Sequence, residues 1–219
     1  GSAPAPRLQH GAVYDPNSNT MIVIGGDDCF STLFEDVSVL SNADGRGGTP
    51  TWTQLNPSGT GPGARELHNQ VAYDPGSNTL IVFGGIGPGG TLFNDVWVLS
   101  NANGQGGTPT WSQLSPSGSL PPARSEGSVI YDAASGRLTV FGGEGPQLLN
   151  DVWVLTNANG SGGTPTWNQL GPFSPFPEAR GDHSAVYVPS TNQMIVFGGL
   201  ISDTLPTNNA WILSHANGM

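Results

Sequence analysis

The segments MIVIGG (21–26), LIVFGG (80–85), LTVFGG (138–143) and MIVFGG (194–199) share one pattern, a run of mostly β-branched and aromatic residues that ends in two glycines. The glycine pairs are 59, 58 and 56 residues apart, so the chain of 219 residues contains four copies of one unit. Self-similarity at this period is typical of an array in which each unit buries its apolar face against its neighbours. The repeat therefore predicts the architecture more directly than the chemistry.

Each copy contains short segments with the pattern of β-strands and none with helical periodicity. A first strand ends at a tyrosine, a turn rich in Asp, Pro, Ser and Asn follows, and the segment before Gly-Gly is the second strand. The third strand has the pattern expected of a half-buried β-strand, in EDVSVL (35–40), NDVWVL (94–99), NDVWVL (150–155) and NNAWIL (208–213). A fourth strand follows an Asn/Gly-rich loop in three copies only, as TPTWTQL (49–55), TPTWSQL (108–114) and TPTWNQL (164–170).

Three features of the unit together resemble the kelch motif: Arg-x-x-His before the first strand, Gly-Gly after the second, and a tryptophan on the outer strands. Two positions depart from it, because Gly127 replaces the histidine in the third copy and Ser38 replaces the third-strand tryptophan in the first. The resemblance implies an all-β fold, a β-propeller of four kelch-like four-stranded antiparallel blades, the last lacking its outer strand. The expected blades are 7–55, 65–114, 124–170 and 180–213 within a single unit spanning 1–219, and Gly1-Ser2 is interpreted as a cloning remnant.

Composition excludes two classes of partner. The chain has six arginines, no lysine and sixteen acidic residues, giving a net charge of −10. Nucleic acids and anionic membranes require a basic patch, so we predict neither as a partner. No apolar run reaches the length of a transmembrane span. Lysine-free repeats rich in Asn, Thr and Gly favour an extracellular or cell-surface location. Cys29 is the one cysteine of the chain and lies beside two aspartates, so we do not expect it to be a nucleophile.

Loops that vary between copies predict the binding face. The loops after Gly-Gly differ in every copy, whereas the Asp-Pro turns and Asn-Gly loops at the other end of the strands are nearly uniform. One arginine per blade is expected on the variable face, where guanidinium groups would suit carboxylates. The favoured interpretation is nevertheless structural, with each arginine paired with local acids such as Glu66, Glu126 and Asp182 or with loop carbonyls that hold the blades together. The predicted ligand-binding residues are Arg7, Arg65, Arg124, Arg180, Asp27, Asp28, Glu144 and Asp203.

Metal, cofactor and catalytic residues are not predicted. His10, His68 and His183 share one position of the motif and are interpreted as hydrogen-bonded residues in preference to metal ligands. The repeated Asn-Ala-Asn/Asp-Gly loops offer oxygen ligands for calcium, but Asn-Gly is also an ordinary turn signal. Neither a radical-oxidase constellation nor a pair of carboxylates across a cleft is evident. We therefore expect no cofactor and more probably no enzymatic activity.

The function expected from the sequence is a non-catalytic binding or scaffolding module for acidic peptides, proteins or glycans. The alternatives are a fragment of a propeller enzyme, of carbohydrate-active or oxidase type, and a self-assembling repeat array without a ligand. Four blades of the usual wedge angle cover only part of a circle and leave apolar flanks. Three arrangements would cover these flanks: a closed four-bladed ring, a homodimer forming one eight-bladed ring, or a longer array of which this chain is a part. The homodimer is the favoured expectation.

Overall fold

The computed structural model describes residues 1–171, 175 and 177–219 and is almost entirely β-structure. The first three blades are four-stranded antiparallel sheets. The first contains β1 (Gly11–Asp15), β2 (Thr20–Ile24), β3 (Val37–Ser41) and β4 (Thr51–Gln54). The second contains β5 (Val71–Asp74), β6 (Thr79–Phe83), β9 (Val96–Ser100) and β10 (Thr110–Gln113). The third contains β11 (Ser128–Asp132), β12 (Arg137–Glu144), β13 (Leu148–Thr156) and β14 (Thr166–Leu170).

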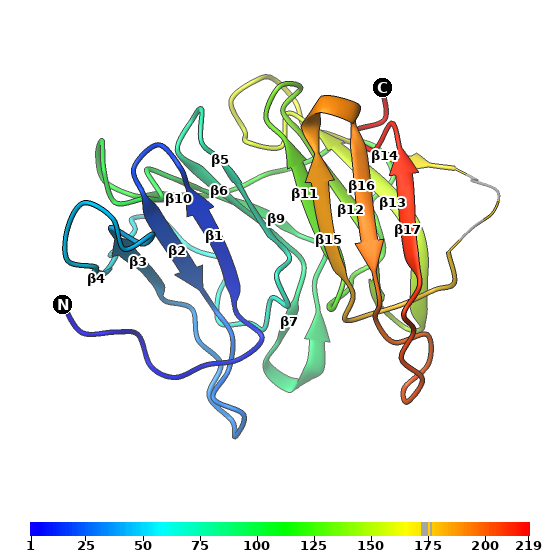
Figure 1. Ribbon diagram of the computed structural model, residues 1–219, viewed down its shortest axis with the longest axis horizontal. Coiled ribbons are helices and arrows are strands. Elements are labelled where there is room, and N and C mark those ends of the chain that lie inside the picture. The colour runs from blue at the N-terminus through cyan, green and yellow to red at the C-terminus, as the bar shows by residue number, and fades with distance from the viewer. Residues whose placement is uncertain (172–174, 176) are drawn as a thin grey trace.

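The fourth blade has three strands, β15 (Ser184–Val188), β16 (Gln193–Phe197) and β17 (Ala210–Ser214), as the repeat predicted. The short hairpin of β7 (Ile86–Gly87) and β8 (Thr91–Leu92) extends the second blade, and the 3₁₀ turns η1 (Pro88–Gly90) and η2 (Pro189–Thr191) are the helical elements. None of the helical segments that the structure describes has the length and apolarity needed to cross a bilayer. Figure 1 shows β1, β5, β11 and β15 towards the middle of the molecule and β4 at its outer side.

The Gly-Gly motif lets the chain before each blade approach the end of the second strand closely. Gly25 and Gly26 have φ of 64° and 90°, a backbone conformation that side chains disfavour. A Cβ on Gly26 would lie 2.5 Å from the Leu8 carbonyl oxygen. Leu8 pairs with Asp27 as an isolated bridge, and the other blades repeat this at Glu66–Ile86, Ser125–Glu144 and Gly181–Leu200. The motif therefore ties each blade's lead-in to the loop after its second strand.

Apolar cores lie between the blades. Ile22, Ile24 and Val39 of the first blade pack with Leu80, Trp97 and Trp111 of the second, and two further clusters join the second blade to the third and the third to the fourth. Trp111 and Trp167 of the outer strands are buried in these cores as predicted, whereas Trp52 is half-buried and belongs to none of them. Each blade is thus stabilised chiefly by the faces of its neighbours.

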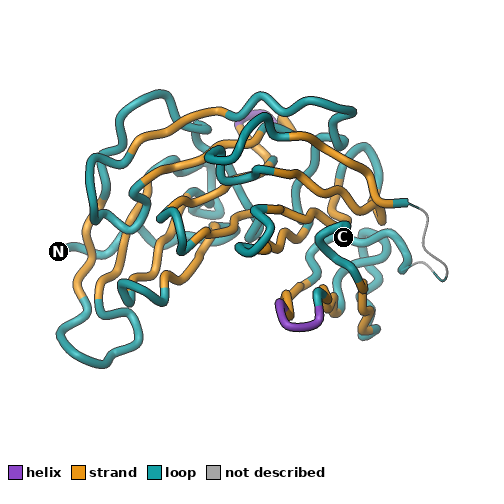
Figure 2. Tube along the Cα trace, turned by 90° about the horizontal axis from the view of Figure 1, so that it is seen from above, coloured by secondary structure: helices purple, strands orange, loops and turns teal. Residues whose placement is uncertain are grey.

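The four blades form an open arc (Figure 2). Val186, Phe197 and Ile212 on the outer face of blade 4 are 58%, 55% and 61% exposed. By strand register they correspond to Val13, Ile24 and Val39 of blade 1, which contribute to the core between blades 1 and 2. The first and fourth blades therefore do not close a ring in the single chain, and we call the exposed face carrying these three residues the open flank.

Candidate functional site at the channel mouth

The four repeated arginines point into the blades, which corrects the predicted ring of exposed guanidinium groups. Arg65, Arg124 and Arg180 are buried, and the Arg7 side chain is 6% exposed. In each blade Nη1 donates to the carbonyl oxygen of the first glycine of Gly-Gly: Gly25, Gly84, Gly142 and Gly198, at 2.9–3.0 Å. Because buried donors need partners, these bonds hold the loop after the second strand. We therefore leave the arginines out of the candidate site.

Three of these arginines have an aspartate partner that the sequence analysis overlooked. Each forms an ion pair with the aspartate at the second position of its blade's repeated third-strand segment. Arg7 pairs with Asp36 at 2.8 Å, Arg65 with Asp95 at 2.7 Å and Arg124 with Asp151 at 2.6 Å. Phe34 and Phe93 cover the guanidinium groups of Arg7 and Arg65. The guanidinium charges are consequently neutralised within the blades and do not favour an acidic ligand.

One residue per blade at a left-handed backbone position lines the axis instead. These residues are Gln9, His68, Glu126 and Asp182, with φ of 55°, 43°, 56° and 52°. Each lies five residues before its blade's first-strand tyrosine. The His68 backbone N–H donates to the Gln9 carbonyl oxygen at 3.0 Å, and that of Asp182 donates to the Glu126 carbonyl oxygen at 3.0 Å. We call this set, together with Asp27, Glu66 and Glu144 beside it, the channel mouth.

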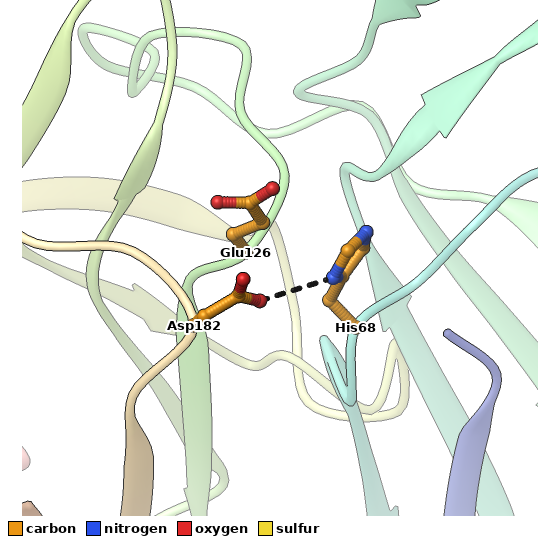
Figure 3. Close-up of side chains that lie close together, drawn as sticks. All are labelled: His68, Glu126 and Asp182. Carbon is orange, nitrogen blue, oxygen red and sulfur yellow. Dashed lines mark ion pairs between the residues drawn. The ribbon is translucent and has the colours of Figure 1, made fainter. Parts of the chain in front are cut away.

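Side chains from three blades converge at the channel mouth. Figure 3 shows His68, Glu126 and Asp182 lying close together on separate segments, with Asp182 pointing toward His68. His68 Nδ1 lies 3.3 Å from Asp182 Oδ1, and His68 Nε2 lies 3.4 Å from Glu66 Oε2. With its amide nitrogen turned toward the acids, Gln9 donates to Glu66 Oε2 at 2.9 Å and to Asp27 Oδ2 at 3.1 Å. The mouth therefore concentrates five carboxyl groups around one imidazole and one amide.

Crowding of acids changes the protonation of Glu126. Burial, followed by the charges of Asp182 and Glu144, raises the pKa of Glu126 to about 7, and His68 opposes the shift. A hydrogen bond with Glu144 contributes in the same direction as burial. Like charges in a partly buried site cannot all ionise freely, so a proton is retained near neutrality. A cationic ligand would relieve this repulsion.

The same three side chains have the chemistry of metal ligands. One ligand atom each from His68, Glu126 and Asp182 lies within 4.8 Å of the other two. An imidazole nitrogen with two carboxylate oxygens is a ligand set that divalent transition ions accept. This group of three is formed by residues that the sequence analysis did not select as ligands.

The remaining predicted ligand residues divide between the mouth and the surrounding loops. Asp27 and Glu144 lie at the mouth, as described above. Asp28 is half-buried and accepts backbone N–H bonds from Thr32, Ser31 and Phe30 at 2.9–3.0 Å, which lower its pKa and shape its own loop. Asp203 is exposed in the loop between β16 and β17. The structure therefore brings together two of the four predicted acids.

The histidines do not occupy equivalent places, contrary to the sequence alignment. Blade 2 has one more residue between its arginine and its tyrosine than the other blades, and this places His68 at the mouth. His183 lies deeper, where Ser128 Oγ is 2.8 Å from Nε2, and burial followed by the Arg180 charge lowers its pKa to about 4.

The side-chain oxygens of the Asn-Gly loops are also engaged, since Asn103 Oδ1 accepts from Asn78 at 2.7 Å and from the Gln105 N–H at 2.9 Å.

Comparison with known proteins agrees with the observed repeat. A sequence profile of the KLHDC2/KLHL20/DRC7 Kelch-repeats domain matches residues 1–161 and 105–218. The chain is 30% identical over 184 residues to Adagio-like protein 3 and 32% identical over 186 residues to Adagio-like protein 1, both from Oryza sativa subsp. japonica. Each of these alignments covers 83% of this chain but only 26% of the relative.

A phosphatase and a solved propeller show the same likeness. Serine/threonine-protein phosphatase BSL2 of Arabidopsis thaliana is 28% identical over 174 residues, covering 76% of this chain and 16% of the phosphatase. The solved structure of YjhT superposes with a TM-score of 0.69 at 17% identity, covering 98% of this chain and 64% of that one. At this identity the superposition supports the fold alone. With the profile matching nearly the whole sequence, the chain belongs to the Kelch-repeat domain family, whose propeller fold serves protein interaction and scaffolding.

Proposed function

We propose that this chain is a non-catalytic binding module whose channel mouth recognises a cationic group, such as a lysine or arginine side chain, on a protein partner. The observation that carries the proposal is the convergence of Glu126, Asp182 and Glu66 around His68. Because the repeated arginines are turned inward, the charge of the mouth is opposite to the one expected from sequence. The acidic-ligand hypothesis is therefore replaced by a basic one.

Electrostatics support this choice. The net charge of −10 attracts cationic partners over a distance set by ionic strength, and carboxylates at a concave end of the molecule focus that field. Glu126 holds a proton near neutrality because it is partly buried and because its neighbours Asp182 and Glu144 are acidic. A bound ammonium or guanidinium group would favour its ionisation. Phe30, 91% exposed in the loop after Gly26, offers an apolar contact beside the mouth.

The experiment is a binding titration with two labelled peptides of equal length, one rich in lysine and arginine and one rich in glutamate. We expect the basic peptide to bind and to lose affinity between low and moderate salt. Glu126→Gln and Asp182→Asn should each weaken binding by about tenfold, the scale of one charged hydrogen bond. Tighter binding of the glutamate peptide would contradict the proposal.

Asp203→Asn is the matched control. It removes the same unit of charge from an exposed loop of blade 4 that lies outside the mouth. Binding reduced equally by Asp203→Asn and Asp182→Asn would show that net charge, rather than the mouth, attracts the peptide.

Self-association is the second candidate function, favoured by the open flank. Its apolar residues match by register those that blade 1 packs against blade 2, so another blade provides a complementary surface. We propose that blade 1 of a second copy covers it, in a homodimer of eight blades. The mass measurement that tests this proposal is argued in the Discussion.

A further inference from the structure

Blade 4 lacks the acid that pairs with the repeated arginine. Asn209 stands at the position of Asp36, Asp95 and Asp151, two residues before the residue that is tryptophan in blades 2, 3 and 4. The arginine itself is kept, as Arg180. The fourth blade therefore retains a buried guanidinium group without the carboxylate that accompanies it elsewhere.

In blades 2 and 3 one carboxylate oxygen accepts from two donors. Asp95 Oδ2 lies 3.3 Å from Arg65 Nη2 and 2.7 Å from Trp97 Nε1. Asp151 Oδ2 lies 2.8 Å from Arg124 Nη2 and 2.7 Å from Trp153 Nε1. A guanidinium nitrogen and an indole nitrogen thus converge on the same oxygen, and this arrangement is built twice within the chain.

Both donors persist in blade 4 without an acceptor. Arg180 is completely buried, and neither its Nη2 nor Trp211 Nε1 has a hydrogen-bond partner among the residues that the structure describes. Arg180 Nη1 still donates to the Gly198 carbonyl oxygen at 2.9 Å and Nε to that of Glu178 at 3.1 Å. These bonds match those of Arg124, so the guanidinium group is held as in blade 3.

Arg180 also lacks the aromatic cover that two of its counterparts have. Thr207 occupies the position at which Phe34 and Phe93 cover the arginines of blades 1 and 2. A hollow of about 550 Å³ is lined by Glu178, Leu205, Thr207, Asn208 and Asn209 among others. It reaches the position of the missing aspartate through Asn209, whereas Arg180 and Trp211 do not line it. Asn209 is exposed, and its side chain accepts from neither donor.

We propose that blade 4 binds a carboxylate group from outside the chain, with Arg180 Nη2 and Trp211 Nε1 donating to one of its oxygens in place of the missing aspartate. A buried guanidinium group left unpaired is costly, and a planar carboxylate satisfies it best. The carboxylate has two available sources, a free small acid or an Asp or Glu side chain of a protein partner. This site is separate from the channel mouth and of opposite charge preference.

The experiment measures the melting temperature of the wild-type protein in sodium formate and in sodium chloride at equal ionic strength. Saturating formate should raise the Tm by about 2 °C or more above chloride, because it binds the folded state. Asn209→Asp supplies the carboxylate internally. This variant should melt roughly 3–8 °C higher than wild type in chloride and show no further rise in formate.

Asn168→Asp is the matched control, since it makes the same substitution at an exposed residue of blade 3 that does not line the hollow. It should keep the formate response, whereas Trp211→Phe should reduce it by removing the indole donor. N-acetyl-glutamate amide is the second probe. A rise equal to that in formate identifies a protein side chain as the source, and a rise in formate alone identifies a free small acid. Equal wild-type Tm values in formate, the glutamate probe and chloride would overturn the proposal, as would an equal formate response in Asn209→Asp.

Discussion

Asn103 Nδ2 of blade 2 donates a hydrogen bond to Asp15 Oδ2 of blade 1 at 2.9 Å, and the bond is repeated at both later blade boundaries. Asn159 donates to Asp74 at 2.8 Å and Asn217 donates to Asp132 at 2.7 Å. The uniform Asn-Gly loops and Asp-Pro turns are therefore partners in one bond between consecutive blades. Their uniformity reflects this geometry rather than a ligand.

Loss of one of these aspartates should destabilise the whole array. Asp74 also accepts from Ser77 at 2.6 Å and from Tyr131 at 3.2 Å, so Asp74→Ala leaves several donors without an acceptor. We expect a loss of about 3 kcal/mol in the free energy of unfolding, measured by urea denaturation. Asp203→Ala, at an exposed loop position, serves as the control and should change it by less than about 0.5 kcal/mol.

The same aspartates should set the response to acid. Although burial opposes the shift, hydrogen bonds from serine and asparagine lower the pKa of Asp15, Asp74 and Asp132 from 3.8. A lowered pKa contributes stability that is present above the unfolded value and lost as pH falls through the folded value. We expect unfolding, followed by circular dichroism, below about pH 4. Asp132→Asn should flatten this pH dependence, and an unchanged slope would contradict the assignment.

Glu126 should make stability depend on pH in the opposite sense. Its pKa is about 7 in the folded chain against 4.5 ordinarily, so between these values only the folded state holds the proton. Stability therefore falls as pH rises from 4.5 through 7. Glu126→Gln stays neutral, and we expect it to gain stability relative to wild type between pH 5 and pH 8 in urea titrations. The other side chains of the mouth are the same in both proteins, so parallel curves would exclude this role for Glu126.

The fold was predictable because its signals are local and repeated four times. Gly-Gly, the first-strand tyrosine and the strand patterns each report a backbone requirement within a few residues, and the three-stranded last blade followed from a missing segment. The channel mouth was not predictable in the same way. One additional residue before β5 moves His68 out of line with His10 and His183, and a motif alignment hides that shift.

The direction of the arginines was missed for a different reason. The partner of Arg124 is Asp151, 27 residues away, and sequence proximity favoured Glu126. A signal was nevertheless present, since the residue before the third strand is aspartate in three copies and asparagine in the one whose arginine remains unpaired. Comparing this one position across the four copies was informative where spacing along the chain was not.

Removing the aspartate carboxylate from blade 2 should leave its buried arginine without an acidic partner, as in blade 4. Asp95→Asn would leave Arg65 and Trp97 facing a neutral amide in place of the charged oxygen. We expect the free energy of unfolding to fall by about 3 kcal/mol, since breaking a buried ion pair from one side leaves the other charge uncompensated. The measurement is urea denaturation of Asp95→Asn beside Asp203→Asn. Equal stabilities would mean that the pair contributes nothing net.

The open flank should determine whether the chain forms a dimer in solution. Val186, Phe197 and Ile212 are exposed although their counterparts in blade 1 contribute to the core, and burying them favours association. At this boundary the bond between blades is unavailable, because Val188 replaces the aspartate of blade 4 and Asp44 replaces the asparagine of blade 1. The contact must therefore rely on apolar packing, and we expect a dimer that is weaker than the internal boundaries.

Light scattering should accordingly give a mass of about 45 kDa, twice the 22.6 kDa of one chain. Phe197→Asp places a charge within the flank and should return the particle to 22.6 kDa. Phe30→Asp is the matched control, because Phe30 is 91% exposed on a loop away from the flank and should leave the mass unchanged. A wild-type mass of 22.6 kDa at high concentration would exclude the homodimer. The flank would then need cover from further blades of a longer chain or from a different protein.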